Sequence, residues 1–494
     1  MGDSEEAKVH EYESDINAMT RTKSQKSATQ APGDLFEIEN GDVNFRGVSW
    51  QGAVILVTKF QIGLGALGLP STFHVLGFVP GVICFLLLGL ICTFAGYICG
   101  TARQYYPYMY SIGDAAELLF GKTGREFIGV IYYIYVTLVA GAAMLTVSVA
   151  LNTLSDHGTC TMVFLAVTCA ATFLVGTGFR SLEKVSWISW VGVAGIIFSI
   201  WIVAIACLTQ DRPAEAPATG PFDRDIRVLP QTTFSTAMAA IANQLFAVGG
   251  SGIFFSISAE MKQPQLFTRS LLCGQAFIIA TNIAIASIMY SKVGQYIASP
   301  ALGSAGILIK KIAYGIAFPG LLVTAILYSH IAAKYAFVRI LRGTRHLQSS
   351  TFQHWAVWSS SNLFTIVFGF IIVSVVPFFD NFLSLVGALF NPVFTNVIPG
   401  FMLLFFIAKK PVKAVEGERC PGIDDSTSVM DWLSGAFHAA KKGRKEAVAF
   451  CIAWFMIFSG FFIIIGGTYA TILNIKTAYD DGEISGTFSC ADNS

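Results

Sequence analysis

Long apolar stretches alternate with short polar connections along most of the chain. Eleven of these stretches are long enough to cross a bilayer as helices, which takes about 20 mainly apolar residues. They cover residues 50–76, 81–103, 126–152, 160–178, 185–208, 233–258, 267–291, 313–338, 357–377, 382–407 and 447–474. The pattern therefore predicts an all-α polytopic membrane protein.

The first span contains a segment that is a poor continuous helix. Lys59-Phe-Gln-Ile-Gly-Leu-Gly-Ala-Leu-Gly-Leu-Pro70 holds three glycines and ends on a proline. In a helix interior, Gly costs roughly 1 kcal/mol relative to Ala, and Pro roughly 3 kcal/mol. Backbone groups freed by a break at membrane depth cannot be satisfied by lipid, so they must face a cavity or a solute. We predict a broken helix that contributes to a ligand site.

The sixth span contains a similar segment, Ala247-Val-Gly-Gly-Ser-Gly-Ile-Phe-Phe255. A single glycine cluster would be explained by close helix packing. Two clusters that are five spans apart enter the membrane from opposite faces, because five is odd. Paired interruptions of this kind are typical of inverted-repeat transporters, whose substrate binds at the midplane.

These breaks give the chain its predicted organisation, a 5+5 inverted repeat with broken helices one and six and an eleventh helix. The predicted parts are a disordered cytosolic tail (1–48), a first five-helix repeat (49–210), an extracellular loop (211–232), a second five-helix repeat (233–407), a cytosolic loop (408–446), an eleventh helix (447–474) and an extracellular tail (475–494).

The ends of broken helices suggest the chemistry of the ligand. Free amides at a helix start attract a carboxylate, and free carbonyls at a helix end attract an ammonium group. An α-amino acid carries both groups on one carbon, and glycine lets it approach the main chain. No Asp or Glu lies deep inside a span, which favours neutral substrates. Aromatic candidates for the rest of the pocket are Phe60, Tyr132, Tyr133, Tyr135, Phe246, Phe254, Phe255 and Tyr328.

Composition and charge agree with a membrane protein and add its orientation. Only 13% of the residues are charged, against about 25% in soluble domains. If the amino terminus is cytoplasmic, the inside loops hold nineteen Lys and Arg residues, and the outside loops with the carboxyl tail hold seven. The bias predicts a cytoplasmic amino terminus and an extracellular carboxyl terminus. The net charge of +1 gives no indication of a nucleic-acid partner.

The cysteines have no metal-ligand spacing, and seven of the ten lie in apolar spans, where packing explains them. Cys160 and Cys490 both fall on the predicted outer side, so a disulfide between them is one option. We expect no metal and no cofactor. The hydrolase motifs HExxH and GxSxG do not occur, which argues against an enzyme.

Three segments resemble one known family. Lys59–Pro70 looks like the first-span signature of the amino acid/auxin permease family, Glu260–Pro264 is similar to its acidic-then-proline element, and His330–Gly343 looks like the eighth-span end of fungal neutral amino acid permeases of the methyltryptophan-resistance type. The resemblance covers about residues 45–475. It implies a LeuT-type fold and inward amino acid transport driven by a proton gradient.

The resemblance also implies a main-chain substrate site. It carries over to Gly63, Leu64, Gly65, Ala66, Leu67 and Gly68 from the first break, and to Gly249, Gly250, Ser251 and Gly252 from the second. Of the aromatic candidates, we predict that Phe246, Phe254 and Tyr135 contact the substrate. Lysines Lys8, Lys23 and Lys26 of the tail would suit recognition by ubiquitin-ligase machinery, as related permeases suggest, although an ordinary disordered tail explains them equally well.

Three ionisable residues are candidates for coupling or gating. Lys59 lies roughly 13 Å inside Trp50 at 1.5 Å per residue; it either snorkels or pairs near the inner gate, or it occupies the place of a sodium ion in sodium-coupled relatives. Glu260 is predicted either to pair with Lys262, Arg269 or Lys334, or to accept a proton. His330 is either a core histidine or a proton-coupling group.

The leading hypothesis is proton-coupled symport of neutral, large aliphatic or aromatic L-amino acids across the plasma membrane. Two alternatives use the same site: an exporter in a vacuolar or other organellar membrane, and an amino acid-sensing receptor with little transport. The location of the protein and the presence of concentrative uptake separate these three hypotheses.

Overall fold

The computed structural model describes residues 45–229, 232–347, 349–375, 379–410, 428–480 and 490. Most of the two predicted tails, the centre of the predicted cytosolic loop, and Lys8, Lys23 and Lys26 lie outside the described residues. The described helices are α2 (Trp50–Ile62), α3 (Gly65–Leu76), α4 (Phe78–Tyr105), α5 (Ile112–Ser155), α6 (Thr161–Gly178), α7 (Leu182–Thr209), α8 (Phe234–Val248), α9 (Ser251–Ala259), α10 (Phe267–Val293), α11 (Ile307–Leu341), α12 (Phe352–Val375), α13 (Phe379–Leu389), α14 (Ile398–Lys409), α15 (Val429–Lys442) and α16 (Arg444–Asp480).

The described part of the chain is all-α, and its helices confirm the predicted spans. Ten helices or helix runs are long and apolar enough to cross a membrane, and the bent pair α2 and α3 makes an eleventh. Both predicted breaks are present. Helix α2 ends at Ile62 and α3 begins at Gly65 with a bend of 47°, while α8 ends at Val248 and α9 begins at Ser251.

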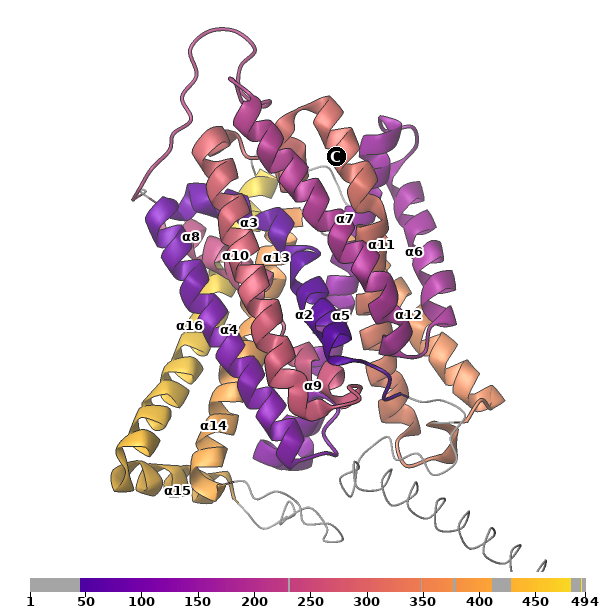
Figure 1. Ribbon diagram of the computed structural model, residues 1–494, viewed down its shortest axis with the longest axis vertical. Coiled ribbons are helices and arrows are strands. Elements are labelled where there is room, and N and C mark those ends of the chain that lie inside the picture. Colours follow the sequence, from indigo (N-terminus) through magenta and orange to yellow (C-terminus); the bar gives the residue numbers. More distant parts are fainter. Residues whose placement is uncertain are drawn as a thin grey trace, which may run out of the picture.

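The two broken helices lie in the interior of the bundle. In the span formed by α8 and α9, 94% of the most apolar window is buried, compared with 28% in α16. Helix α16 is therefore a peripheral, lipid-facing helix, whereas α8 and α9 are surrounded by protein. Figure 1 shows α2 and α3 near the centre of the view, with α10 and α4 beside them and α7 and α11 on the other side.

The connections before and after some spans carry additional helical structure. Helix α5 begins at Ile112, before the predicted span, and turns sharply at Gly121, whose φ of +70° favours glycine. Residues 291–312 contain two 3-10 turns, η2 (Gly294–Tyr296) and η3 (Ala301–Ala305). Further 3-10 turns are η1 (Pro264–Leu266) and η4 (Arg345–Leu347).

Two elements were not expected from the sequence. The tenth span is not a uniform α-helix, because one π-helical turn, η5 (Val393–Val397), separates α13 from α14. The predicted cytosolic loop contains the helix α15, which lies across the lower ends of α14 and α16 in Figure 1. A disulfide joins Cys160, at the start of α6, to Cys490 of the carboxyl tail, which is the option that the predicted topology allowed.

Candidate functional site

The first break is held open by side chains of α11. The last four carbonyls of a helix have no partner within it. One of these in α2, the carbonyl of Phe60, accepts a hydrogen bond of 2.5 Å from the hydroxyl of Tyr328, and the two rings pack edge to face at 5.1 Å. A Cβ at Gly63 would lie 2.8 Å from Cγ2 of Thr324, so only glycine lets α11 come this close.

The second break has an equivalent contact from the tenth span. The carbonyl of Leu245, near the end of α8, accepts a hydrogen bond of 3.2 Å from Nδ2 of Asn391. That amide nitrogen lies 2.5 Å from the position that a Cβ on Gly249 would take. Gly249 therefore makes room for the side chain that satisfies the end of α8.

The two breaks meet at Gln61, which the sequence analysis missed. Its Nε2 donates to the carbonyl of Val57 at 3.3 Å and lies 3.2 Å from the Cβ position of Gly250. Oε1 of Gln61 and Oγ of Ser251 are two of the twenty buried side-chain atoms of the described residues that have no hydrogen-bond partner, and they lie beside the two breaks. Buried polar atoms are rarely left unpaired, so these two indicate a place for water or a polar solute.

The predicted stretch 63–68 is buried throughout, and it contacts α8 as well as α11. A Cβ on Gly65 would lie 2.4 Å from Cα of Ala247, so this glycine allows α3 to pack on α8. The carbonyl of Gly68 accepts a hydrogen bond of 3.3 Å from Nδ2 of Asn243. Leu64, Ala66 and Leu67 belong to the hydrophobic core.

An aromatic cluster lies beside the second break. A Cβ at Gly252 would lie 3.3 Å from both Tyr132 of α5 and Phe394 of η5. The rings of Tyr135 and Phe394 are 5.2 Å apart, and those of Tyr132 and Phe394 are 5.7 Å apart. Phe390 is 6.1 Å from Tyr135. The structure thus places the predicted residue Tyr135 in this cluster, together with Phe390 and Phe394, which the sequence analysis did not select.

The two other predicted aromatic contacts lie elsewhere. Phe254 packs against Phe267 of α10, with ring centroids 6.0 Å apart, and its ring lies 2.9 Å from the Cβ position of Gly96 in α4. Phe246 lies against Gly387 of α13. Both side chains contribute to helix packing around the breaks.

Lys59 is fully buried between three helices. Its Nζ donates a hydrogen bond of 2.8 Å to the carbonyl of Gly320 in α11, and its Cε lies 3.2 Å from the Cβ position of Gly192 in α7. It does not reach the surface, so the snorkelling interpretation does not describe this arrangement. Within the described residues it also has no ion pair with a carboxylate.

Glu260 forms one of the three ion pairs that were considered for it. Its Oε1 lies 2.6 Å from Nζ of Lys334, and both side chains are fully buried. Its Oε2 accepts a hydrogen bond of 3.2 Å from the amide of Leu182, at the start of α7. The other two candidates lie elsewhere: Lys262 is 3.7 Å from Glu183, and Arg269 stacks over Trp50.

The segment that precedes α2 covers this ion pair. The ring of Phe45 lies 4.4 Å from Nζ of Lys334. Backbone bonds of 3.0 and 2.8 Å join Val48 to Glu260 and to Lys262. Residues 45–48, Glu260, Lys262 and Lys334 therefore form a closed layer, which we call the inner layer.

His330 lies one helical turn before Lys334, and it is fully buried. Its ring packs edge to face on Trp358 at 5.2 Å. This packing is what a core histidine would show, and proton coupling through His330 stays a prediction.

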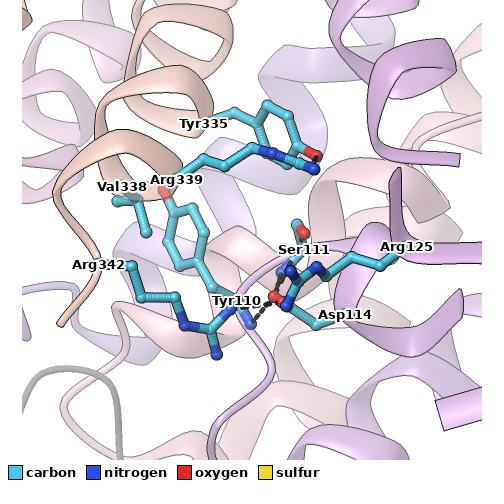
Figure 2. A pocket seen from close by; sticks show the side chains of 8 residues that line it. All are labelled: Tyr110, Ser111, Asp114, Arg125, Tyr335, Val338, Arg339 and Arg342. Carbon is cyan, nitrogen blue, oxygen red and sulfur yellow. Dashed lines mark hydrogen bonds and ion pairs between the residues drawn. The ribbon is translucent and has the colours of Figure 1, made fainter. Parts of the chain in front are cut away.

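A polar cavity of about 70 Å³ lies between the start of α5 and the end of α11. Figure 2 shows arginines of both helices around it, with Arg342 beside Tyr110 and Asp114. Arg342 donates to Oδ1 of Asp114 at 2.7 Å and to the carbonyl of Tyr108 at 3.2 Å. These contacts join α11 to α5, so the cavity belongs to a junction between helices and not to the breaks.

Buried broken helices one and six within an eleven-span bundle define a transporter of the LeuT-type fold. The structure is similar to that of Mhp1, a nucleobase-cation-symport-1 family transporter in a closed conformation with bromovinylhydantoin bound, with a TM-score of 0.50 at 14% identity over 92% of this chain and 98% of that chain. At this identity the likeness supports the fold alone.

Sequence comparison then gives the family. Residues 46–421 match the family described as transmembrane amino acid transporter protein, and the chain belongs to that family. A "Transmembrane transporter" of Gibberella moniliformis is 31% identical over 461 residues, covering 93% of this chain and 91% of the relative. The "N amino acid transport system protein" of Neurospora crassa is 27% identical over 462 residues, covering 92% and 91%. The chain is a multi-pass membrane transporter and not an enzyme, and the predicted resemblance is confirmed.

Proposed function

We propose that this transporter carries neutral, large aliphatic or aromatic L-amino acids into the cytosol together with protons. The observation that supports it most directly is the meeting of two broken helices at Gln61 and Ser251, where two buried oxygen atoms lack protein partners. A zwitterionic solute carries an ammonium group that can donate hydrogen bonds to these oxygen atoms and a carboxylate that can accept them from free amides. Residues 54–73 and 241–258, which contain the two breaks, hold no Asp or Glu, which argues against cationic substrates.

In the proposed binding mode, amides at the starts of α3 and α9 take the substrate carboxylate. These amides belong to residues 64–66 and 250–252, because the amide of Leu67 already donates to the carbonyl of Leu64 at 3.1 Å. Carbonyls at the ends of α2 and α8 that are not already bonded take the ammonium group. The side chain is proposed to lie against Tyr132, Tyr135 and Phe394, of which Tyr132 and Phe394 pack closely on Gly252.

Lys59 is the proposed coupling group. Its ammonium is held by a carbonyl of α11 and lies next to α7, so it supplies a fixed positive charge where a sodium-coupled transporter would bind its cation. Loss of the proton from Lys59 would weaken its bond to Gly320 and loosen α2 against α11. The pair of Glu260 and Lys334 is proposed to hold the inner layer closed while the substrate is bound from outside.

The proposed orientation has a cytoplasmic amino terminus in the plasma membrane. It is supported by the excess of Lys and Arg in the loops on the side of the inner layer. The disulfide between Cys160 and Cys490 is compatible with it, because both residues would then lie in an oxidising compartment.

The test is radiolabelled uptake into proteoliposomes with separately imposed proton and sodium gradients. We expect Leu and Phe to accumulate with a proton gradient, and Arg and Glu to accumulate poorly. Uptake that follows sodium and ignores the proton gradient would refute the coupling. Arg transported better than Leu would refute the substrate class.

A further inference from the structure

Helix α15 has the properties of a helix that lies in a membrane surface. Figure 1 shows it crossing the lower ends of α14 and α16, which rise from it into the bundle. Trp432 is buried against Phe401 and Phe405 of α14, with ring centroids 6.4 and 5.9 Å apart. Met430 and Phe437 are instead 72% and 48% exposed. An amphipathic helix with exposed apolar residues and a lysine-rich end suits the interface between water and lipid.

The elbow between the end of α14, α15 and the start of α16 forms a half-open cavity of about 430 Å³. Its polar lining consists of Lys410, His438, Lys442 and Glu446. A Cβ on Gly443 would lie 2.1 Å from Oε2 of Glu446, so the glycine between α15 and α16 lets this carboxylate lie against the turn.

The described side chains around the cavity carry a net positive charge. Residues 409–410 and 428–446 contain six basic side chains and two acidic ones, and residues 411–427, which lie outside the described part of the chain, add two basic and four acidic ones. One of the two acidic groups, Asp431, caps α15 by accepting from the amide of Ser428 at 3.2 Å. None of the six basic side chains forms an ion pair within the described residues. Lys441 lies 4.3 Å over the ring of Phe437, at the exposed apolar edge of α15.

We propose that this elbow binds the headgroup of an anionic phospholipid of the cytosolic leaflet. The phosphate would lie between Lys410 and Lys442, and the acyl chains would follow exposed apolar residues of α16 such as Val448 and Phe455. Basic pockets between membrane helices on the cytosolic side are suited to such headgroups. The site goes beyond the proposed transport function and uses only its orientation.

The geometry favours a lipid over a free anion. The cavity lies at the end of α14 and the start of α16, and the apolar residues Ile407, Ala408 and Ala439 line it together with the charged groups. A soluble phosphate would bind the basic side chains but would leave these apolar side chains exposed to water. Trp432 packs on Phe401, which in turn packs on Phe120 of α5 at 5.3 Å, so a lipid held in the elbow also stabilises the contact between α14 and α5.

The test uses the full-length protein in detergent, with lipid binding measured by native mass spectrometry and thermal stabilisation. The probes are phosphatidylserine, phosphatidylcholine and inorganic phosphate. We expect phosphatidylserine to bind and stabilise the protein more strongly than phosphatidylcholine. Equal binding of the two lipids would overturn the proposal, and so would full stabilisation by inorganic phosphate alone.

Variants locate the site. Each lysine is expected to strengthen phosphatidylserine binding on the order of fivefold. The double variant Lys410→Gln/Lys442→Gln should therefore weaken that binding by more than about tenfold. The matched control is Lys122→Gln/Lys184→Gln, which removes two exposed lysines elsewhere at the same end of the protein and should bind as the wild type does. Lys410→Arg/Lys442→Arg should retain binding, which separates loss of charge from misfolding. Equal losses in the control and the elbow variant would refute the assignment, whatever the uptake assay shows.

Discussion

Breaking the buried pair of Glu260 and Lys334 should open the inner layer. In Glu260→Gln, the ammonium of Lys334 stays buried without its carboxylate partner, and in Lys334→Met the carboxylate of Glu260 is left in the same situation. Removing one partner of a buried pair costs about 3–5 kcal/mol, whereas replacing both partners is often nearly neutral. The cost falls on conformations in which the layer is closed, so each single variant shifts the population toward a state in which this layer is open.

The expected shift is large enough to measure by hydrogen exchange. A loss of about 3–5 kcal/mol corresponds to roughly 10²- to 10⁴-fold in the ratio of closed to open states. Two amides report the opening directly, because those of Val48 and Lys262 are bonded across the layer. Peptides that contain these amides should exchange faster in each single variant. In the double variant Glu260→Gln/Lys334→Met, exchange should return most of the way to the wild-type rate.

The matched control is Lys262→Met, which removes a nearby but exposed charge. Lys262 and its partner Glu183 are 57% and 43% exposed, and such pairs contribute about 0–1 kcal/mol. Exchange in this variant should resemble that of the wild type. The reasoning fails if the single variants exchange as slowly as the wild type, or if the double variant shows the sum of the two single losses.

Three further substitutions test the site. Tyr328→Phe keeps the ring but leaves the buried carbonyl of Phe60 without its donor, so we expect a loss of about 1–3 kcal/mol in stability and slower uptake. The control is Tyr133→Phe, because the hydroxyl of Tyr133 is only partly buried. An equal effect of the two variants would count against the role of Tyr328. Gly252→Ala should reduce kcat/KM for Phe uptake more than for Ala uptake; a uniform reduction would mean that this glycine serves packing. Lys59→Met should abolish stimulation of uptake by a proton gradient while exchange of substrate across the membrane continues, and a variant that still responds to the gradient would exclude Lys59 as the coupling group.

The span pattern and both breaks could be predicted because their signals are local. Apolar stretches of membrane length are visible in the sequence and predict spans, because a helix needs about 20 apolar residues to cross the bilayer. Glycine clusters inside them are also visible and predict breaks, because glycine is unfavourable in a helix interior. The orientation of the breaks relative to each other also followed from simple counting. The sequence narrowed the candidate ion-pair partners of Glu260 to three. Choosing Lys334 among them required knowing how α9 and α11 approach each other.

The residues that complete the site were harder to predict. Phe390 and Phe394 are two of 41 phenylalanines, and nothing local distinguishes them from packing residues. Gln61 and Asn391 did carry a signal, because each is a polar amide inside an apolar span. Gly65 shows the opposite limit, since its glycine signal was read as access for the substrate although its missing Cβ faces Ala247. Gly252 is the glycine chosen for substitution because its Cβ position faces Tyr132 and Phe394 of the aromatic cluster and not the backbone of α8.

Helix α15 could have been predicted from local features. Ser428 and Asp431 form a capping box, which is a sequence signature of a helix start, and Trp432 and Ala436 repeat at helical spacing. Its position across α14 and α16 depends on tertiary contacts and could not be derived in this way.

The link between Cys160 and Cys490 closes a covalent ring over 330 residues, from the start of α6 to the carboxyl tail. A single protease cut anywhere inside that ring would leave both fragments attached to each other. Nicked protein would migrate as one chain until it is reduced, and α16 would stay with the bundle. The eleventh helix is therefore retained by a bond as well as by packing, and a transporter cut once between these two cysteines keeps all its spans together.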